Sequence, residues 1–157
     1  MRAEDVLVPD FALADGEAMI ATNLPGPIRL TSALLPQLRA QAKAAVLNVT
    51  LGLAFVPLAI TPTYSASKAA LHSYSQSLRH QLRGASVEVV ELAPPAVATD
   101  LMPRSRCNLN ALRMEDYSAE TMALPDENPQ AAEIFVPLSA VCARLNGKAT
   151  TTRSLPC

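Results

Sequence analysis

Residues 61–82 read TPTYSASKAALHSYSQSLRHQL, a stretch with the pattern of a long amphipathic helix. We expect this helix to run from 63 to 83, with Gly84 as a natural C-terminal cap because glycine adopts the left-handed conformation without strain. Its predicted buried side consists of Ala69, Ala70, Leu71, Tyr74, Leu78 and Leu82. Near the N-terminal end, Tyr64 and Lys68 are four residues apart and therefore share one face of the helix.

Two runs typical of β-strands flank this helix in the sequence. AAVLNVT, at 44–50, is apolar nearly throughout, which predicts a strand covered on both faces. SVEVVELA, at 86–93, predicts a second strand. Upstream, residues 16–38 carry apolar side chains at helical spacing. Asp15 is a plausible N-cap of that helix, and the Pro-Gly-Pro at 25–27 should kink or split it.

Two further segments complete the pattern. Residues 114–124 predict a short helix, and residues 128–145 begin as a helix that Pro137 should interrupt. The alternation of helices and strands predicts an α/β fold, namely part of a Rossmann-like, doubly wound parallel sheet. Only two strands are convincing, whereas such sheets usually have about five or more. We therefore expect this chain to belong to a larger unit or to pair with another chain.

The composition narrows the class of protein. The chain has 157 residues, of which 50% are apolar and 17% charged, as expected for one domain with a packed core. The net charge is -1 and no basic patch is present, which argues against a nucleic-acid partner. No signal peptide is recognisable, and no apolar run reaches the roughly 18 residues of a membrane span. We expect a cytoplasmic protein with no membrane partner.

Cysteine and histidine do not form a recognisable metal motif. The three cysteines are widely scattered and none lies in a CxxC, which predicts free thiols instead of a zinc site or a disulfide framework. They are Cys107, Cys142 and Cys157. His72 and His80 lie in the predicted helix, and the chain has no GxSxG motif, which argues against a serine hydrolase. We interpret both histidines as surface or interface residues and predict no metal site.

The Tyr64–Lys68 pair has a chemical use. A free phenol has a pKa of about 10, too high for easy proton exchange at neutral pH. A neighbouring ammonium stabilises the phenolate and lowers that pKa, which suits a general acid or base in carbonyl reduction. Small residues surround the pair, and they would let another molecule approach the helix closely. The alternative is an ordinary pair of side chains on an exposed helix surface.

Three consecutive segments carry a family resemblance. AAVLNVT, GLAFVPLAITPTYSASKAALHSYSQSLRHQL and VEVVELAPPAVATDLM together resemble the second half of a short-chain dehydrogenase/reductase (SDR). Within that family the chain looks most like bacterial oxidoreductases of the D-alanine lipoteichoic acid type. The likeness extends from residue 11 to 147 and is strongest from 46 to 102. It implies a truncated Rossmann-like domain at 1–147, with the N-terminal half absent, and a polar tail at 148–157.

The resemblance also implies roles for individual residues. Tyr64 matches the proton donor, Lys68 the residue that lowers its pKa and binds the nicotinamide ribose, and Asn23 the asparagine of the proton relay. The implied contacts with the cofactor, NAD or NADP, come from Tyr64, Lys68, Pro94, Val97 and Thr99. The implied substrate is a small alcohol or carbonyl compound. Helices 16–38 and 63–83 match those that form a homodimer interface in the family.

The sequence departs from the family pattern at important positions. Leu51 occupies the position of the catalytic serine that orients the substrate carbonyl, and the neighbouring Thr50 should face the opposite side of the strand. The five glycines all stand alone, so no glycine-rich phosphate loop is present. Pro95 replaces a glycine and cannot donate a backbone N–H. We therefore expect very weak or no oxidoreductase activity, and the alternative is a non-catalytic SDR-derived chain that acts through helix-mediated dimerisation.

Overall fold

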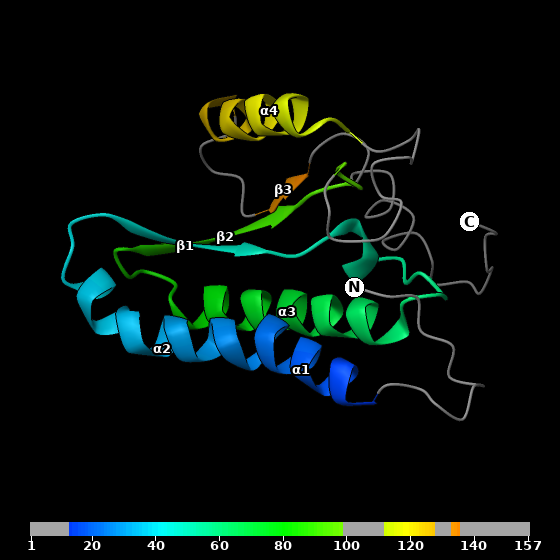
Figure 1. The fold of residues 1–157 in the computed structure, drawn as a ribbon. Helices are drawn as coiled ribbons and strands as arrows, with labels where there is room; N and C mark the ends of the chain where they lie inside the picture. Colours follow the sequence, from blue (N-terminus) through cyan, green and yellow to red (C-terminus); the bar gives the residue numbers. More distant parts are fainter. Residues whose placement is uncertain (1–12, 99–111, 128–132, 136–157) are drawn as a thin grey trace, which may run out of the picture.

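A computed structural model describes residues 13–98, 112–127 and 133–135 (Figure 1). Its centre is a parallel sheet of three strands in the order β1-β2-β3. They are β1 (Ala44–Val49), β2 (Val87–Ala93) and β3 (Glu133–Phe135). β1 pairs with β2 from Ala44↔Val87 to Val49↔Leu92, and β3 pairs with the end of β2. This is the predicted α/β fold with a partial Rossmann-like sheet.

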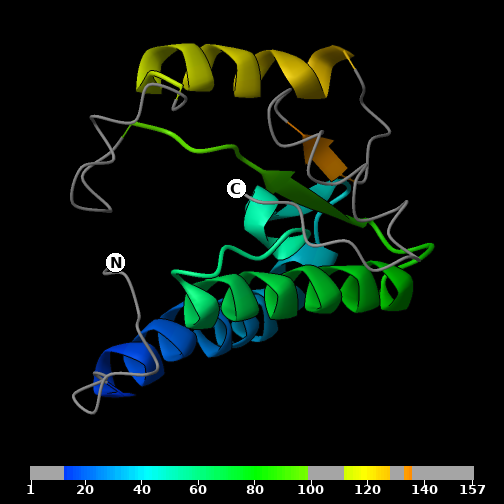
Figure 2. The same cartoon turned by 90° about the vertical axis from the view of Figure 1, so that its right-hand side faces the viewer.

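Helices lie on both sides of the sheet. In Figures 1 and 2, α1 (Leu13–Asn23), α2 (Pro25–Arg39) and α3 (Pro62–Gln81) lie on one side, and α4 (Met114–Glu127) lies on the other. A short 3₁₀ turn, η1 (Gly52–Ala54), follows β1. The long predicted helix and the helix at 114–124 are confirmed. The split expected at 25–27 is also confirmed, because α1 ends at Asn23 and α2 begins at Pro25.

Three predictions about these elements are wrong. β3 lies inside the segment that was expected to start as a helix at 128–145, so the sheet has a third strand. The apolar residues around Ile134 have helical spacing, but pairing of Ile134 with Leu92 in the sheet outweighs that local pattern. Asp15 is the third residue of α1 and not its N-cap. β1 is not covered on both faces, since Leu47 and Val49 are 55% and 45% exposed.

The layer between α3 and the sheet is unusually polar. Leu71 and Leu78 are buried as predicted, but Ala69, Ala70, Tyr74 and Leu82 are only half-buried. The other buried residues of α3 are Tyr64, Ser65, Ser67 and Ser75. Facing them from the sheet are Asn48 and Glu91, 6% and 1% exposed. Buried polar groups require hydrogen-bond partners, so this layer is held together by specific bonds as well as by apolar contact.

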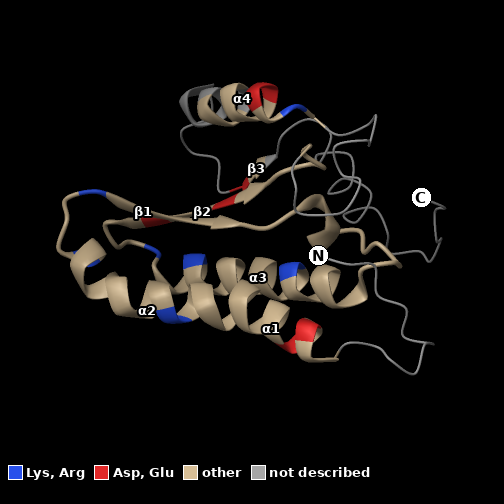
Figure 3. Ribbon diagram, in the orientation of Figure 1, with Lys and Arg blue, Asp and Glu red and all other residues tan. Residues whose placement is uncertain are grey.

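The charged side chains of the described residues are dispersed. In Figure 3 lysine and arginine do not gather on one face, and acidic residues mark the first turns of α1 and α4. Acidic side chains stabilise a helix N-terminus because its backbone N–H groups carry partial positive charge. No helix among the described ranges combines the length and the apolar character needed to cross a bilayer.

The predicted boundary between a domain at 1–147 and a tail at 148–157 stays a prediction. The tail and the three cysteines lie outside the described residues, as does Pro137.

Candidate functional site

The Tyr64–Lys68 pair lies where α3 begins, beside the carboxyl end of β1. α3 starts at Pro62, whose missing N–H costs nothing in the first helical turn. The loop that precedes it is fastened to the helix, because the Leu58 N–H donates to Ser65 Oγ at 3.2 Å. Parallel strands commonly place functional groups at their carboxyl ends, and this pair follows that rule.

Tyr64 and Lys68 are in contact range, as their spacing predicted. The Lys68 Nζ lies 5.7 Å from the centre of the Tyr64 ring, close enough for a cation–π attraction. The same Nζ donates to the Val49 carbonyl oxygen at 2.9 Å. Tyr64 is 9% exposed. The helix thus brings a buried phenol and a fixed ammonium to the end of β1.

The direction of the Tyr64 pKa corrects one expectation. Burial raises the pKa of Tyr64 above 10.0, whereas the ammonium was expected to lower it. Burial also lowers the pKa of Lys68 below 10.5, since a desolvated ammonium loses its hydration. Desolvation is therefore the dominant influence on both groups, and the phenol stays protonated at neutral pH.

Asn23 lies at the end of α1, one turn of α3 away from Tyr64. Its Nδ2 donates to Ser67 Oγ at 3.1 Å, and the Ser67 hydroxyl donates to the Tyr64 carbonyl oxygen at 2.8 Å. The break between α1 and α2 places this side chain against α3. The structure therefore brings Asn23, Tyr64 and Lys68 to one region.

Leu51 is the second residue after β1 and has extended backbone. Its side chain is half-buried and has no hydroxyl. Thr50 does not replace the missing group: it is 1% exposed, and its Oγ1 donates to Glu91 Oε1 at 2.8 Å. The prediction that Thr50 faces away from the Leu51 position agrees with this arrangement.

The residues after β2 approach the same end of the sheet. Pro94 is buried, and its carbonyl accepts the Gly52 N–H at 3.2 Å. Val97 forms an isolated parallel bridge with Leu112. The Gly52–Pro94 bond places Pro94 beside η1, next to Leu51. Thr99, the remaining residue of the predicted cofactor contacts, lies outside the described residues.

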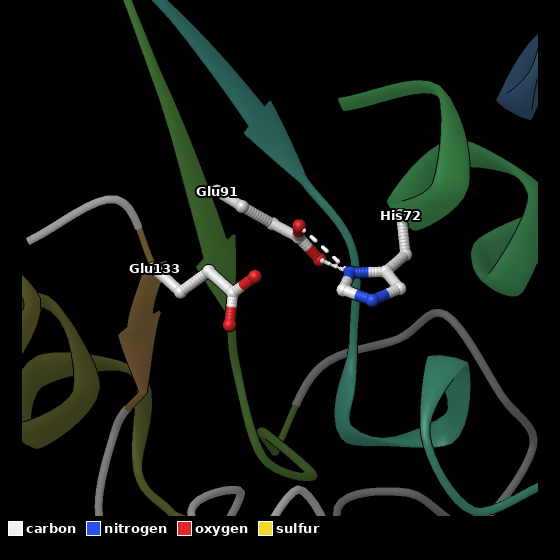
Figure 4. A group of neighbouring side chains, drawn as sticks. All are labelled: His72, Glu91 and Glu133. Atoms are coloured by element: carbon white, nitrogen blue, oxygen red, sulfur yellow. Dashed lines mark hydrogen bonds and ion pairs between the residues drawn. The ribbon is translucent and has the colours of Figure 1, made fainter. Parts of the chain in front are cut away.

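A second polar group was not predicted. His72 is not a surface residue: its side chain is 18% exposed, and its Nδ1 lies 2.8 Å from both carboxylate oxygens of Glu91 (Figure 4). Its Nε2 lies 3.1 Å from Gln76 Nε2, which assigns the imidazole proton to Nδ1. The sequence did contain a signal for this pair. Val87, Val89 and Glu91 share one face of β2, and an acid in an otherwise apolar inward-facing series indicates a buried polar partner. His80, by contrast, is exposed.

His72, Glu91 and Glu133 converge from α3, β2 and β3, with ligand atoms within 4.8 Å of one another (Figure 4). Such a group could in principle hold a divalent cation. The acidic groups already have partners, however: the His72 Nδ1–H donates to the Glu91 carboxylate, and Arg79 Nη1 lies 3.7 Å from Glu133 Oε1. An arginine at this distance disfavours a second cation, so the group is explained as a structural network.

Comparison with known proteins identifies the family. The model of the short chain dehydrogenase family matches residues 3–110, more than half of the chain. The chain belongs to the short chain dehydrogenase family. An oxidoreductase of Bacillus subtilis (strain 168), DltE, which is itself uncharacterized, is 53% identical over 92 residues. That match covers 59% of this chain and 36% of the relative, and the chain spans well under half the length of the relatives it matches.

Solved SDR structures share the fold. A short chain dehydrogenase of Burkholderia cenocepacia in complex with NADP has a TM-score of 0.74 at 19% identity, covering 96% of this chain and 69% of that one. The closed form of a serine dehydrogenase complexed with NADP+ has the same TM-score at 23% identity, covering 87% of this chain and 60% of that one. The SDR resemblance inferred from YSASK and its flanking strands is thus confirmed at the level of family and fold.

Proposed function

We propose that this chain is an SDR-type oxidoreductase portion that uses NAD or NADP to reduce or oxidise a small alcohol or carbonyl compound. The observation that carries the proposal is the Tyr64–Lys68 pair, with Nζ held 5.7 Å from the ring centre at the end of β1. Asn23 and Pro94 lie near the same end of the sheet, and Val97 and Thr99 are proposed as further cofactor contacts by resemblance.

The donor set of this pair fits the ribose end of a nicotinamide cofactor. An ammonium has three N–H donors, and the Val49 carbonyl takes one of them in the described part of the chain. The remaining donors, with the Tyr64 hydroxyl, suit neighbouring ribose hydroxyls. When bound, NAD or NADP supplies or accepts the hydride. The glycines of this sequence are all isolated, so no phosphate cradle of the usual kind is recognisable within it, which predicts weak affinity.

Tyr64 handles the proton of the reaction. During reduction its phenol donates the proton to the carbonyl oxygen of the substrate, and in oxidation the phenolate takes a proton from the alcohol. Burial raises the pKa of Tyr64 and keeps it protonated, which favours the reductive direction. Asn23, one helical turn away, is proposed to hold the water that resupplies the proton.

Leu51 limits the proposed reaction. A catalytic hydroxyl at this position would donate a hydrogen bond to the substrate oxygen, and leucine cannot. Losing one oriented donor of this type costs about 10²–10³ in rate. We therefore propose that the oxidoreductase activity of this chain is very weak and that its substrates are alcohols or carbonyl compounds, as the family resemblance implies.

Direct titration with cofactor tests this proposal. NADH and NADPH are added to purified protein, and binding is followed by nucleotide fluorescence and calorimetry. We expect weak binding by the wild type, further weakened in Lys68→Met and retained in Lys43→Met, which removes an exposed lysine. No detectable binding to the wild type would exclude the oxidoreductase function for this chain. Micromolar affinity would instead show that the predicted loss of function is wrong.

A non-catalytic dimer is the second candidate, favoured by exposed apolar side chains on α1 and α2. Ile20, Leu30 and Leu34 are 41%, 62% and 40% exposed. Exposed apolar patches mark interaction surfaces. We propose that 16–38 and 63–83 form a homodimer surface. Light scattering after size exclusion is expected to show that the wild type is a dimer and that the double variant Leu30→Glu, Leu34→Glu is a monomer. A monomeric wild type would exclude the homodimer.

A further inference from the structure

One face of α3 is tied to the end of β1 by three polar links. Lys68 Nζ donates to the Val49 carbonyl at 2.9 Å. Four residues later His72 reaches Glu91, whose carboxylate accepts the Thr50 hydroxyl at 2.8 Å. Ser75 accepts a bond from Asn48 Nδ2 at 2.9 Å. Positions 68, 72 and 75 lie on one helix face, so these links form one row along the sheet.

Glu91 is the anchor of the middle link. It is 1% exposed, and both carboxylate oxygens lie 2.8 Å from His72 Nδ1 (Figure 4). A buried carboxylate is strongly destabilising without such donors, so Glu91, His72 and Thr50 must stay together. His72 also contacts Gln76 and makes a T-shaped contact with the Phe55 ring, whose centre lies 4.6 Å from the centre of the imidazole.

This arrangement fixes the carbonyl that holds Lys68. Val49 lies between Asn48 and Thr50, and both of these side chains are bonded to groups outside β1. The Thr50 N–H also donates to the Leu92 carbonyl at 2.9 Å. The peptide that presents the Val49 oxygen to Lys68 therefore has little freedom to rotate.

We infer that Glu91, oriented by His72, is a positioning residue that places Lys68 beside Tyr64 through Thr50 and the Val49 carbonyl. The inference rests on the proposed function for the use made of Lys68, although the placement itself requires no cofactor. Neither His72 nor Glu91 contacts the reacting groups in this arrangement. Their effect travels through the backbone at the end of β1.

Nuclear magnetic resonance of lysine side chains tests the placement directly. The chain has three lysines, Lys43, Lys68 and Lys148, so the signals of protein made with carbon-13-labelled lysine can be assigned with Lys68→Met. Thr50→Val removes the hydroxyl without changing shape or charge, and Thr50→Ser keeps it. The matched control is Thr22→Val, on exposed α1, where the hydroxyl donates to Ala18.

We expect Thr50→Val to move the Lys68 methylene signal next to Nζ, while the signals of Lys43 and Lys148 stay in place. Thr50→Ser and Thr22→Val should leave the Lys68 signal unchanged, and Glu91→Gln should move it in a folded protein. An unmoved Lys68 signal in Thr50→Val overturns the inference, as does an equal movement in Thr22→Val. Unfolding of Thr50→Val alone also overturns it, because the hydroxyl would then serve stability and not placement.

The cofactor titration separates this inference from the proposed function. A moved Lys68 signal without NADH or NADPH binding would support the positioning role of Glu91 and reject the oxidoreductase function. Binding with an unmoved Lys68 signal would support the function and reject the positioning role.

Discussion

At the scale of single residues, burial decides the chemistry of the candidate pair. A nearby ammonium alone would lower the pKa of Tyr64, but the phenol is enclosed and its pKa is raised. The Lys68 ammonium is also desolvated and bonds to the Val49 carbonyl. The four-residue spacing predicts that the groups meet. It carries no information about how much water reaches them, which depends on packing by distant segments.

Leu51→Ser tests the most important substitution in the site. A hydroxyl restored after β1 should donate to the substrate oxygen, and the rate of carbonyl reduction is expected to rise by about 10²-fold. The rate is measured from cofactor consumption with a panel of small aldehydes and ketones. Leu53→Ser, in the following 3₁₀ turn, is the matched control and should have no such effect. Equal rates for Leu51→Ser and the wild type would show that position 51 does not face the substrate.

Lys68 should give stability a characteristic pH dependence. The pKa of Lys68 in the native protein lies below 10.5. At pH values between this native pKa and 10.5, the unfolded chain therefore binds more protons than the native protein. Stability should therefore rise with pH in this window. Urea unfolding of wild type and Lys68→Met at several pH values checks the sign: the wild type should gain stability relative to the variant as pH rises. Tyr64 acts oppositely above pH 10.0 because its pKa is raised, but it is common to both proteins. A constant difference across the window would contradict the buried ammonium.

At the scale of elements, the turn between α3 and β2 depends on one glycine. Gly84 has φ 79°, a left-handed conformation, and an added Cβ would meet nothing within 4 Å. Gly84→Ala should therefore destabilise the protein through backbone strain alone, by about 1–2 kcal/mol in urea unfolding. Gly16→Ala is the contrasting control. Gly16 lies in α1 with ordinary contact to Thr63, so alanine there should stabilise by roughly 0.5–1 kcal/mol. Equal effects of the two changes would contradict the turn geometry.

Strong local patterns made most of the elements predictable. α3, β1 and β2 follow from apolar periodicity, and the break between α1 and α2 follows from the two prolines that flank Gly26. β3 was missed because a three-residue strand carries little signal of its own and forms only by pairing with β2. The His72–Glu91 bond was missed for a related reason. It joins residues 19 positions apart across a helix and a strand, and only their register brings them together.

At the scale of the whole molecule, the described residues expose apolar side chains on the helices and on β1. α1 and α2 expose Ile20, Leu30 and Leu34, and the outer face of β1 exposes Leu47 and Val49. Among the described residues β1 pairs with β2 alone, so its other edge carries main-chain groups outside the sheet ladder. An apolar sheet edge of this type promotes association between chains.

Leu47→Lys distinguishes the sheet edge from the helices as the source of self-association. A lysine at this 55% exposed position should lower any association that occurs through β1, measured by light scattering at several concentrations, because charge on an edge strand opposes strand addition. The unfolding free energy should change by less than about 0.5 kcal/mol, as is usual for surface positions. Ala85→Lys, exposed in the turn between α3 and β2 and outside both proposed surfaces, adds the same charge elsewhere and should not alter association. If association persists in Leu47→Lys and disappears in the Leu30→Glu, Leu34→Glu variant, the helices form the interface. If it disappears in Leu47→Lys alone, chains meet through β1, and the helix-mediated dimer is excluded.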